Sequence, residues 1–527
     1  MRLLLASILT SLALSSMGQS PQVPMDIYST CRVERQLTDS PAALHPEVKP
    51  LSMWDVKALG ADLSFMQGNK TNDETNAAYL LLSPIINGTG FYEIGSKNQT
   101  ALESYIGARL LSGFKDKIKL SADLLAGYNE PVSNMKALTD SVFVVPGYSY
   151  ANKHGNGYGF NQSTIQLAWR PSKLVEISAG RGKHFIGEGY RSLFLSDFAP
   201  NYNYLKTQVN VWRIKYTILY SQMRSAQGST AKFYPLQNKY SSTHHLSLNV
   251  TKWWSVGAFE SVVWQSEDSL RKRQFDINYV NPIIFFRPVE YSIGSSDNYV
   301  MGFTSTIRPA KGLTLYSQIF LDEFLVKEFL APVFAKIHPD SNIGLQSWVN
   351  KQAFQFGIKY HEPFGWKNAS TLAEVNIVRP YTYSHGNSNQ NYTHMNQPLG
   401  YAMGANLIEW ISMTMWQPSD RWNTSITTTY LRKGYSNSGF NAGENPGLSS
   451  TALLNAKRQY GYHLLQGTIH DVANVRLEVG YTLVKQWNMR VESSIQYRSL
   501  RTTAQTTSNV FFGLGLRTAL WNDYRNL

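Results

Sequence analysis

Three groupings of acidic and histidine side chains have spacings that could support catalysis or metal binding. His184 and Glu188 stand four residues apart, as metal ligands do on one face of a helix. Glycines at positions 187 and 189 oppose such a helix, and no HExxH motif occurs in the chain. Asp322 and Glu323 could supply a glycosidase carboxyl pair, yet adjacent residues do not by themselves set the facing separation of about 5 to 9 Å that this chemistry needs.

The neighbouring histidines His244 and His245 form the third grouping. In a strand they would point to opposite faces and could not share a ligand. None of the three groupings meets the geometric requirements of a catalytic centre. The sequence therefore predicts a protein that is not an enzyme and that holds no metal or other cofactor.

Charged side chains are concentrated in the glycine-rich stretch 180–197. Its candidate site residues are Arg181, Lys183, His184, Glu188, Tyr190, Arg191 and Asp197. Cationic groups beside a tyrosine ring could hold an acidic sugar through charge-assisted hydrogen bonds and ring contact. The same residues could instead form an ion-pair network that packs a loop into the interior, because charges that face inward need partners. Charged groups often form such structural networks, so we favour the second interpretation.

A second group of polar residues follows a pair of prolines. Its members are Arg287, Glu290, Asp297 and Asn298. Pro282 and Pro288 bracket the apolar residues 283–286, which therefore cannot form a regular central strand. The pattern predicts an ordered, inward-folded loop, in which these polar residues bind a ligand or, as we favour, lock the loop in place.

The elements that would position these residues alternate between apolar and polar side chains. In the clearest case, Trp212, Ile214 and Tyr216 share one face, and Arg213 and Lys215 share the other. A period of two is typical of strands, because helices repeat every 3.6 residues. Soluble β-sandwiches and propellers alternate in the same way, so the pattern alone leaves the class of β-fold open.

Composition and loop lengths favour a membrane barrel over those soluble folds. Mean hydropathy is −0.28, and no run beyond the start of the chain approaches the ~20 apolar residues of a membrane helix. The aromatic content of 13% suits the aromatic girdles of a barrel. Long polar loops are expected at 148–163, 384–398 and 434–450, and short helices within 46–60 and 321–336. The alternating residues 510–520 are expected to close an all-β, antiparallel transmembrane barrel against an early strand. In such a barrel we expect Trp212, Ile214 and Tyr216 to face lipid, and Arg213 and Lys215 to face the lumen.

The start of the chain has the pattern of a secretory signal peptide. Arg2 precedes an apolar run that ends at Leu14, and small residues follow before Gln19. Cys31 is the only cysteine, which excludes an internal disulfide. We therefore expect a signal peptide at 1–18, an N-terminal periplasmic segment with a short helix at 19–77, and an outer-membrane β-barrel at 78–527.

Several motifs, taken in order, resemble the signature of the capsule-assembly Wzi family of outer-membrane proteins. They are 180–193, 195–197, 281–283, 287–290, 294–298, 321–324 and 404–406. Within that family they most resemble the Bacteroidota branch, which includes gliding-motility proteins of the RemB type. The resemblance covers most of the chain after the signal peptide. It implies a barrel of about eighteen strands, with short helices at one end, long extracellular loops and loops that narrow the pore.

The resemblance also implies a function, which is to bind or organise capsular polysaccharide at the cell surface, and it carries over no catalytic residues. The formal net charge of +13 would attract acidic surface polysaccharide and lipopolysaccharide phosphates, and part of the excess is expected on periplasmic turns. We predict an integral protein of the cell outer membrane, in contact with its lipid, with no nucleic-acid partner. A porin-like passive channel stays open as an alternative. So does an accessory of gliding motility or adhesin display that works with surface-motility or export machinery.

Overall fold

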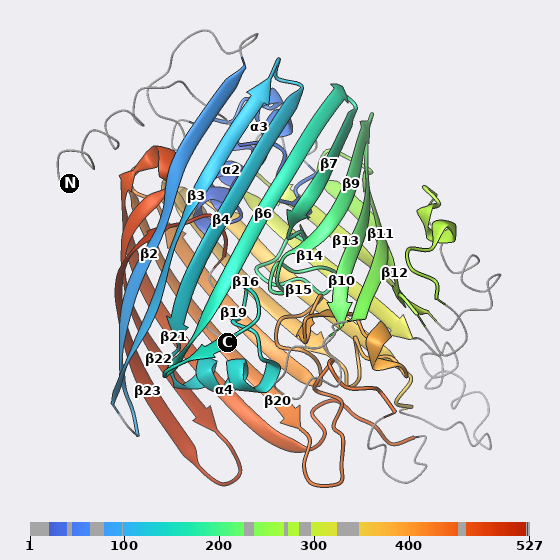
Figure 1. The fold of residues 1–527 in the computed structure, drawn as a ribbon, viewed down its shortest axis with the longest axis vertical. Coiled ribbons are helices and arrows are strands. Elements are labelled where there is room, and N and C mark those ends of the chain that lie inside the picture. The colour runs from blue at the N-terminus through green and yellow to red at the C-terminus, as the bar shows by residue number, and fades with distance from the viewer. Residues whose placement is uncertain are drawn as a thin grey trace.

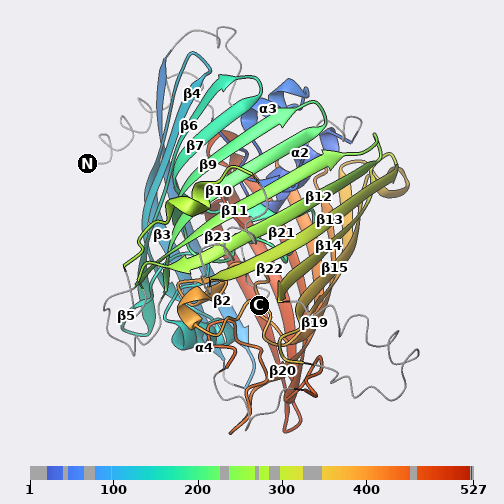
Figure 2. The same cartoon turned by 90° about the vertical axis from the view of Figure 1, so that its right-hand side faces the viewer.

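The strands of the chain close into a single antiparallel barrel (Figures 1 and 2). The computed structural model describes residues 20–38, 45–63, 78–96, 98–225, 237–267, 272–283, 297–323, 347–451, 460–522 and 524. The 18 wall strands within these ranges are β2 (Tyr79–Ile94), β3 (Gln99–Phe114), β4 (Ile118–Glu130), β6 (Gly157–Ser172), β7 (Val175–Gly182), β9 (Tyr202–Val211), β10 (Ile214–Ser225), β11 (Gln237–Asn249), β12 (Trp254–Gln265), β13 (Asn298–Ala310), β14 (Leu313–Glu323), β15 (Lys351–His361), β16 (Ala369–Val378), β19 (Leu407–Trp416), β20 (Trp422–Tyr435), β21 (Thr468–Val484), β22 (Met489–Arg501) and β23 (Thr506–Thr518). The last strand pairs with the first, from Asn87 opposite Arg517 to Ile94 opposite Val510. The predicted fold class and the predicted closure are confirmed.

Shorter elements lie inside the barrel, at its ends and, in the case of η1, outside its wall. They are α2 (Ile27–Gln36), α3 (Met53–Ala58), α4 (Ser133–Val142), β1 (Val48–Lys49), β5 (Asn152–His154), β8 (Phe185–Ile186), β17 (Thr393–His394), β18 (Gln397–Pro398) and the 3-10 turns η1 (Ile277–Val280), η2 (Pro363–Gly365), η3 (Ser388–Gln390) and η4 (Lys485–Trp487). Helix α3 falls within the predicted range 46–60. The range 321–336 begins with the end of β14, and its remainder lies outside the described residues.

Alternate side chains of each strand point into the lumen and onto the outer wall. On β10, the Lys215 ammonium reaches the carboxylate of Asp55 inside the barrel at 3.1 Å, and Tyr216 points outward. Trp212 and Arg213 do not belong to this strand, because they form the two-residue turn between β9 and β10, where Trp212 has a φ of +56°. The prediction that Lys215 faces the lumen is therefore confirmed, and the same prediction for Arg213 is wrong.

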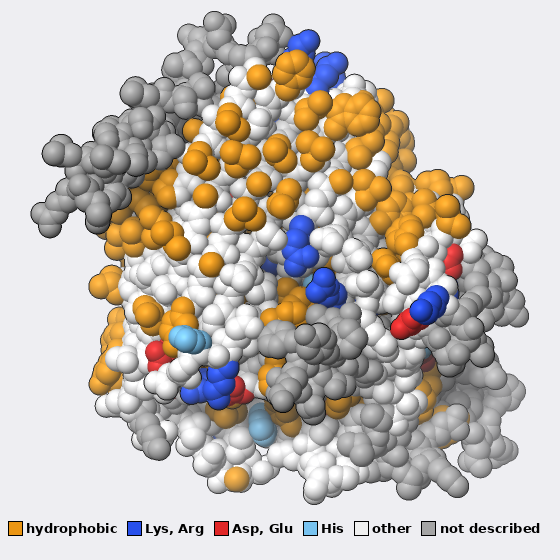
Figure 3. Space-filling model, viewed as in Figure 1, with side chains coloured by type: hydrophobic (Ala, Val, Ile, Leu, Met, Phe, Trp, Pro, Cys, Tyr) orange, Lys and Arg blue, Asp and Glu red, His pale blue; other side chains and the backbone are white. Residues whose placement is uncertain are grey.

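The outer wall carries the apolar belt of a membrane protein. Large apolar side chains such as Ile106, Leu124 and Leu514 are 55–71% exposed near the middle of their strands. Figure 3 shows such side chains gathered over the upper part of the wall, with few charges among them. Closure pairs every wall strand, so the barrel exposes no open sheet edge to hydrocarbon. The protein is therefore an integral outer-membrane β-barrel.

Among the described residues, no helix is both long enough and apolar enough to cross a membrane.

The two ends of the barrel differ in the lengths of their connections. At one end, turns such as Trp212–Arg213 join consecutive strands; at the other end lie most of the long connections, such as 379–406 and 436–467. Outer-membrane barrels keep short turns in the periplasm and long loops outside, so we call these the periplasmic end and the outer end, at the top and bottom of Figure 1. Helices α2 and α3 lie at the periplasmic end, as expected for short helices at one end of the barrel, and a further helix, α4, lies at the outer end.

Three segments fill much of the lumen. We call them the N-terminal segment (20–63), the inward loop (183–201) and the lumen loop (379–406). Strand β1 of the first pairs with β8 of the second, and Ser196 N–H of the second donates to Leu399 O of the third at 2.7 Å. An apolar cluster between them and the wall includes Phe194 stacked on Phe259, with 4.6 Å between ring centroids. An apolar core of the protein thus lies inside the barrel.

The connection between β12 and β13 lies on the outside of the barrel in its described part. The hydroxyls of Tyr216 and Tyr220, on the outer wall, donate to Pro282 O at 2.9 Å and to Val280 O at 3.0 Å. In both views this segment, which includes η1, lies outside the wall strands (Figures 1 and 2). The predicted inward fold is wrong for residues 281–283, because outward-facing tyrosines supply donors for their carbonyl groups.

The residues after β23 turn back into the lumen. Met25 N–H donates to Leu520 O at 3.1 Å, and the Trp521 ring lies 6.0 Å from that of Tyr105, centroid to centroid. The hydroxyl of Tyr524 donates to the carboxylate of Asp197 in the inward loop. We call residues 519–524 the C-terminal tail. It helps to fill the lumen together with the three segments above.

Candidate functional site

The inward loop brings together six of the residues predicted from the sequence, and two of them, Glu188 and Arg191, form ion pairs with the barrel wall. The six are Lys183, His184, Glu188, Tyr190, Arg191 and Asp197. The Glu188 carboxylate accepts from the Lys359 ammonium at 2.6 Å and lies 3.5 Å from the Arg308 guanidinium. The Arg191 guanidinium contacts the Glu409 carboxylate at 3.3 Å, and both residues are fully buried. Each of these charges thus has an opposite charge from the barrel wall.

A wall carboxylate also holds the backbone of the loop. The N–H groups of Tyr190 and Arg191 donate to Glu374 at 2.9 and 3.3 Å. A Cβ placed on Gly189 would lie 2.1 Å from Oε2 of Glu374, so a larger residue would push the loop away from this acceptor. The glycine is therefore needed for the close approach of the loop to the wall.

The remaining residues of the loop are buried among polar partners. His184 Nδ1 lies 3.2 Å from the Tyr202 hydroxyl, and burial together with the charge of nearby Lys206 lowers the pKa of His184, so the ring is neutral at pH 7. The Lys183 ammonium donates to Gly147 O at 2.5 Å, and burial lowers the pKa of Lys183 to about 8. Among the described residues, no group of three or more His, Cys, Asp or Glu side chains could hold a metal ion.

The other predicted site residues lie elsewhere. Arg181 is opposite Ile165 in the β6–β7 pair and therefore shares its outward face, where the guanidinium donates to Asn203 at 3.2 Å. This removes Arg181 from the lumen group. At the base of β13, the Asp297 carboxylate accepts from Arg273 at 2.8 Å, and Asn298 donates to Gln390 O of the lumen loop at 2.9 Å. Arg287 and Glu290 lie outside the described residues.

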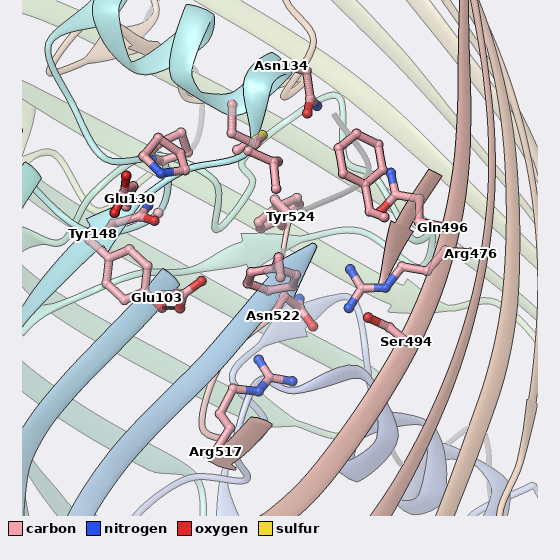
Figure 4. Close-up of a pocket in the computed structure, with 18 of the residues that line it drawn as sticks. Glu103, Glu130, Asn134, Tyr148, Arg476, Ser494, Gln496, Arg517, Asn522 and Tyr524 are labelled. Atoms are coloured by element: carbon pink, nitrogen blue, oxygen red, sulfur yellow. Dashed lines mark hydrogen bonds between the residues drawn. The ribbon is translucent and has the colours of Figure 1, made fainter. Parts of the chain in front are cut away.

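A second site, which the sequence does not predict, lies under α4 at the outer end. We call it the outer pocket; it has a volume of about 920 Å³, counted with the solvent at its mouth. Its lining comes from the barrel wall, from α4 and from the C-terminal tail. Figure 4 shows Arg476, Ser494 and Gln496 on one side, Glu103 and Tyr148 on the other, and Asn522 and Tyr524 between them.

Both aromatic rings and hydrogen-bonding groups line the outer pocket. Tyr148 and Trp521 meet edge to face with 6.2 Å between ring centroids, and the Tyr148 hydroxyl donates to Glu103 at 2.9 Å. The guanidinium of Arg517 donates two bonds to Glu492, at 2.9 and 3.1 Å, which fixes its position on the wall. Concave sites with aromatic walls and a few oriented polar groups are typical of small-molecule and saccharide binding.

The sequence gives little sign of the outer pocket because its parts are far apart along the chain. Glu103 and Gln496 are separated by almost 400 residues, and each looks like an ordinary lumen-facing residue of its own strand. The one local signal is the pair of aromatic residues Trp521 and Tyr524 beyond the last strand, where a barrel needs none. Their position predicts a tail that packs against something other than lipid.

No protein-family model matches the chain, and no curated protein matches it. Among solved structures, the chain is similar to Wzi, an outer-membrane protein of Escherichia coli involved in group 1 capsule assembly and described as a carbohydrate-binding β-barrel. The identity is 12% over 95% of this chain and 100% of that one, with a TM-score of 0.54, which shows a shared fold. Two outer-membrane proteins of Pseudomonas aeruginosa are more distant. OccK8 has 10% identity over 83% of this chain and 97% of its own, with a TM-score of 0.43. OprD has 10% identity over 82% and 94%, with a TM-score of 0.39.

Proposed function

We propose that the protein is a non-enzymatic outer-membrane barrel that binds surface polysaccharide, of the capsular kind, at its outer end. The observation that carries the proposal is the outer pocket, where aromatic rings and oriented polar groups lie together under α4. Sugars offer hydroxyl groups for such polar partners and apolar ring faces for tyrosine and tryptophan. Arginines in the lining suit the carboxylates of acidic sugars, which they hold by charge-assisted bonds.

Two further features support this function. The inward loop, the lumen loop and the C-terminal tail fill space that a diffusion channel would leave open, which disfavours the porin-like alternative. The barrel also shares its fold with a protein described as carbohydrate-binding. The sequence identity between the two is so low that the similarity extends to the fold alone. No feature of the described residues favours the gliding-motility accessory of the RemB type over polysaccharide binding.

Removing hydrogen-bonding groups from the outer pocket tests the proposal. The double variant Ser494→Ala and Gln496→Ala shortens two lumen-facing side chains of β22 while its backbone pairing stays intact. We expect it to bind polysaccharide extracted from the producing cells about tenfold more weakly, because each lost hydrogen bond costs about 0.5–1.5 kcal/mol. Titration calorimetry of the purified barrel in detergent measures the affinity, with neutral dextran as the comparison ligand.

The control is Ser493→Ala, which makes the serine-to-alanine part of this change on the outward face of the same strand. It should bind as the wild-type protein does. The proposal fails if the wild-type barrel does not bind the extracted polysaccharide, or if the double variant binds as tightly as the control.

A further inference from the structure

Every turn between consecutive strands at the periplasmic end carries a lysine or an arginine. The cations are Lys115, Lys117, Lys173, Arg213, Lys252, Lys311, Lys367, Arg421 and Lys485, and we call them the turn cations. All except the half-buried Lys485 are exposed. Because the turns follow one another around the wall, the turn cations form a ring around the periplasmic rim of the barrel.

The carboxylates of the same turns neutralise only part of this charge. They are Asp116, Glu362 and Asp420. Asp420 pairs with Arg32 of α2 and accepts from Lys485 at 2.9 Å. The Asp116 carboxylate lies 3.0 Å from the ammonium of the buried Lys119 and accepts from the Trp54 indole of α3 at 3.2 Å, and the Asp116 carbonyl accepts from the same indole at 2.7 Å. Two of the three carboxylates thus hold the N-terminal segment, which leaves the exposed rim with excess positive charge.

Exposed tryptophans lie at the same level as the turn cations. Those that flank the periplasmic turns are Trp169, Trp212, Trp253, Trp366, Trp416 and Trp422, each at least 38% exposed. The guanidinium of Arg213 lies 5.1 Å from the ring centroid of Trp212. Tryptophan prefers the headgroup layer of a membrane, because one side of its ring system is apolar and the other carries an N–H donor. This places the turn cations at the height of lipid headgroups.

We propose that the turn cations bind the phosphates of anionic phospholipids in the periplasmic leaflet of the membrane. Lysine and arginine beside the apolar belt can lay their methylene stems along it and extend their charges into the headgroup layer. Basic residues close to an anionic membrane surface attract it strongly, and salt weakens the attraction. This lipid site is separate from the outer pocket and does not depend on polysaccharide binding.

The distribution of the cations favours lipid over an acidic protein partner. A protein that docks on charge would require a compact patch, whereas these residues are spread one or two to a turn around the whole rim. Lipid surrounds a barrel on every side, so a ring of cations can bind many headgroups at once. Tryptophans at the same height would be of little use to a partner that stays in the aqueous phase.

The full-length protein in nanodiscs of mixed phosphatidylcholine and phosphatidylglycerol tests the proposal. After mild extraction with detergent, mass spectrometry of the lipids that stay bound gives the enrichment of phosphatidylglycerol over the starting mixture. The triple variant Lys173→Gln, Lys252→Gln and Lys367→Gln removes exposed cations from three separate turns. We expect the triple variant to enrich phosphatidylglycerol less than the wild type does, by up to about fivefold for each charge removed at low salt. The enrichment by the wild type should itself decrease when salt is added.

The matched control is Lys136→Gln with Lys153→Gln, which removes two exposed lysines from α4 and β5 at the outer end. It should keep the wild-type enrichment, and unchanged mobility on unheated gels confirms that all variants are folded. The proposal is overturned if the wild-type barrel does not enrich phosphatidylglycerol, if the triple variant enriches it as strongly as the wild type, or if the control loses as much. An acidic soluble partner would give the first of these results.

Discussion

At the scale of single residues, the surroundings of Arg191 show whether the inward loop is packed against the wall or is open to a ligand. Its side chain is fully buried, and its guanidinium lies 5.0 Å from the Tyr190 ring centroid and 5.8 Å from that of Tyr524. Its charge partner is Glu409 of β19. A cation enclosed in this way is held by the protein itself, so Arg191 serves to fix the inward loop to the wall.

Replacing Arg191 with methionine should lower the free energy of unfolding by about 3–5 kcal/mol, because Glu409 would remain as an unpaired buried charge. Urea unfolding of the barrel in liposomes measures the change. Arg181→Met is the control, since that arginine lies on the outer wall, and we expect a change within about 0.5 kcal/mol. An Arg191→Met barrel with wild-type stability and lost polysaccharide binding would show that Arg191 contacts the ligand.

At the scale of elements, carboxylates hold the N-terminal segment to the wall. Burial alone would raise their pKa values, but opposite charges and hydrogen bonds outweigh it. Lys359 and Lys49 lower the pKa of Glu34, His245 and Thr304 lower that of Glu47, and Lys215 and Arg170 lower that of Asp55. A carboxyl group whose pKa is lower in the folded state stabilises that state above its unfolded pKa of about 4.

Acid should therefore loosen the N-terminal segment before it unfolds the barrel. The stabilisation is fully present above about pH 5 and is lost as the pH falls through the lowered pKa values of the folded state. Hydrogen exchange at pH 7 and pH 3, corrected for intrinsic rates, should show weaker protection of α2 and α3 at pH 3 and unchanged protection of β22. Equal protection of the two helices at both values would mean that these ion pairs do not hold the segment.

Two outward-facing strand residues at different heights test where the strands lie in the membrane. Leu514 is 64% exposed near the middle of β23, whereas Ile214 begins β10 beside a turn. Leu514→Arg should cost about 2–4 kcal/mol, and Ile214→Arg only about 0–1, because the cost of a cation falls towards the membrane interface. Urea unfolding in liposomes measures both stability costs. Equal costs for the two variants would show that the apolar belt is not centred where the account places it.

The strands are predictable from the sequence because lumen and lipid impose opposite preferences on alternate residues. The pattern alone does not show where a strand ends. It therefore places Trp212 and Arg213 in a strand although they form a turn, and it places Arg181 in a glycine-rich polar stretch although that residue belongs to β7. Helix α2 is missed for a different reason. Its buried positions include Tyr28 and Arg35, whose partners lie hundreds of residues away in β16, β20 and β21 or beside them. Such long-range pairing has no local signature.

At the scale of the whole molecule, the lumen contents form one connected body. The N-terminal segment pairs with the inward loop, the inward loop bonds the lumen loop, and Tyr381 N–H of the lumen loop donates to Gly443 O of the β20–β21 connection at 2.8 Å. The C-terminal tail joins this body through Asp197. This filling of the lumen supports the proposed binding function over that of a passive channel.

Planar-bilayer recording of the purified protein tests this central claim most directly. The account predicts no steady conductance steps of the size that porins give, because the N-terminal segment, the inward loop, the lumen loop and the C-terminal tail together occupy much of the lumen. The control is a variant that lacks the N-terminal segment (20–63), which removes one of the segments inside the lumen. If a segment of the lumen blocks conductance, this variant should conduct more than the intact protein. Stable porin-sized steps from the intact protein would contradict the account and identify the barrel as a channel.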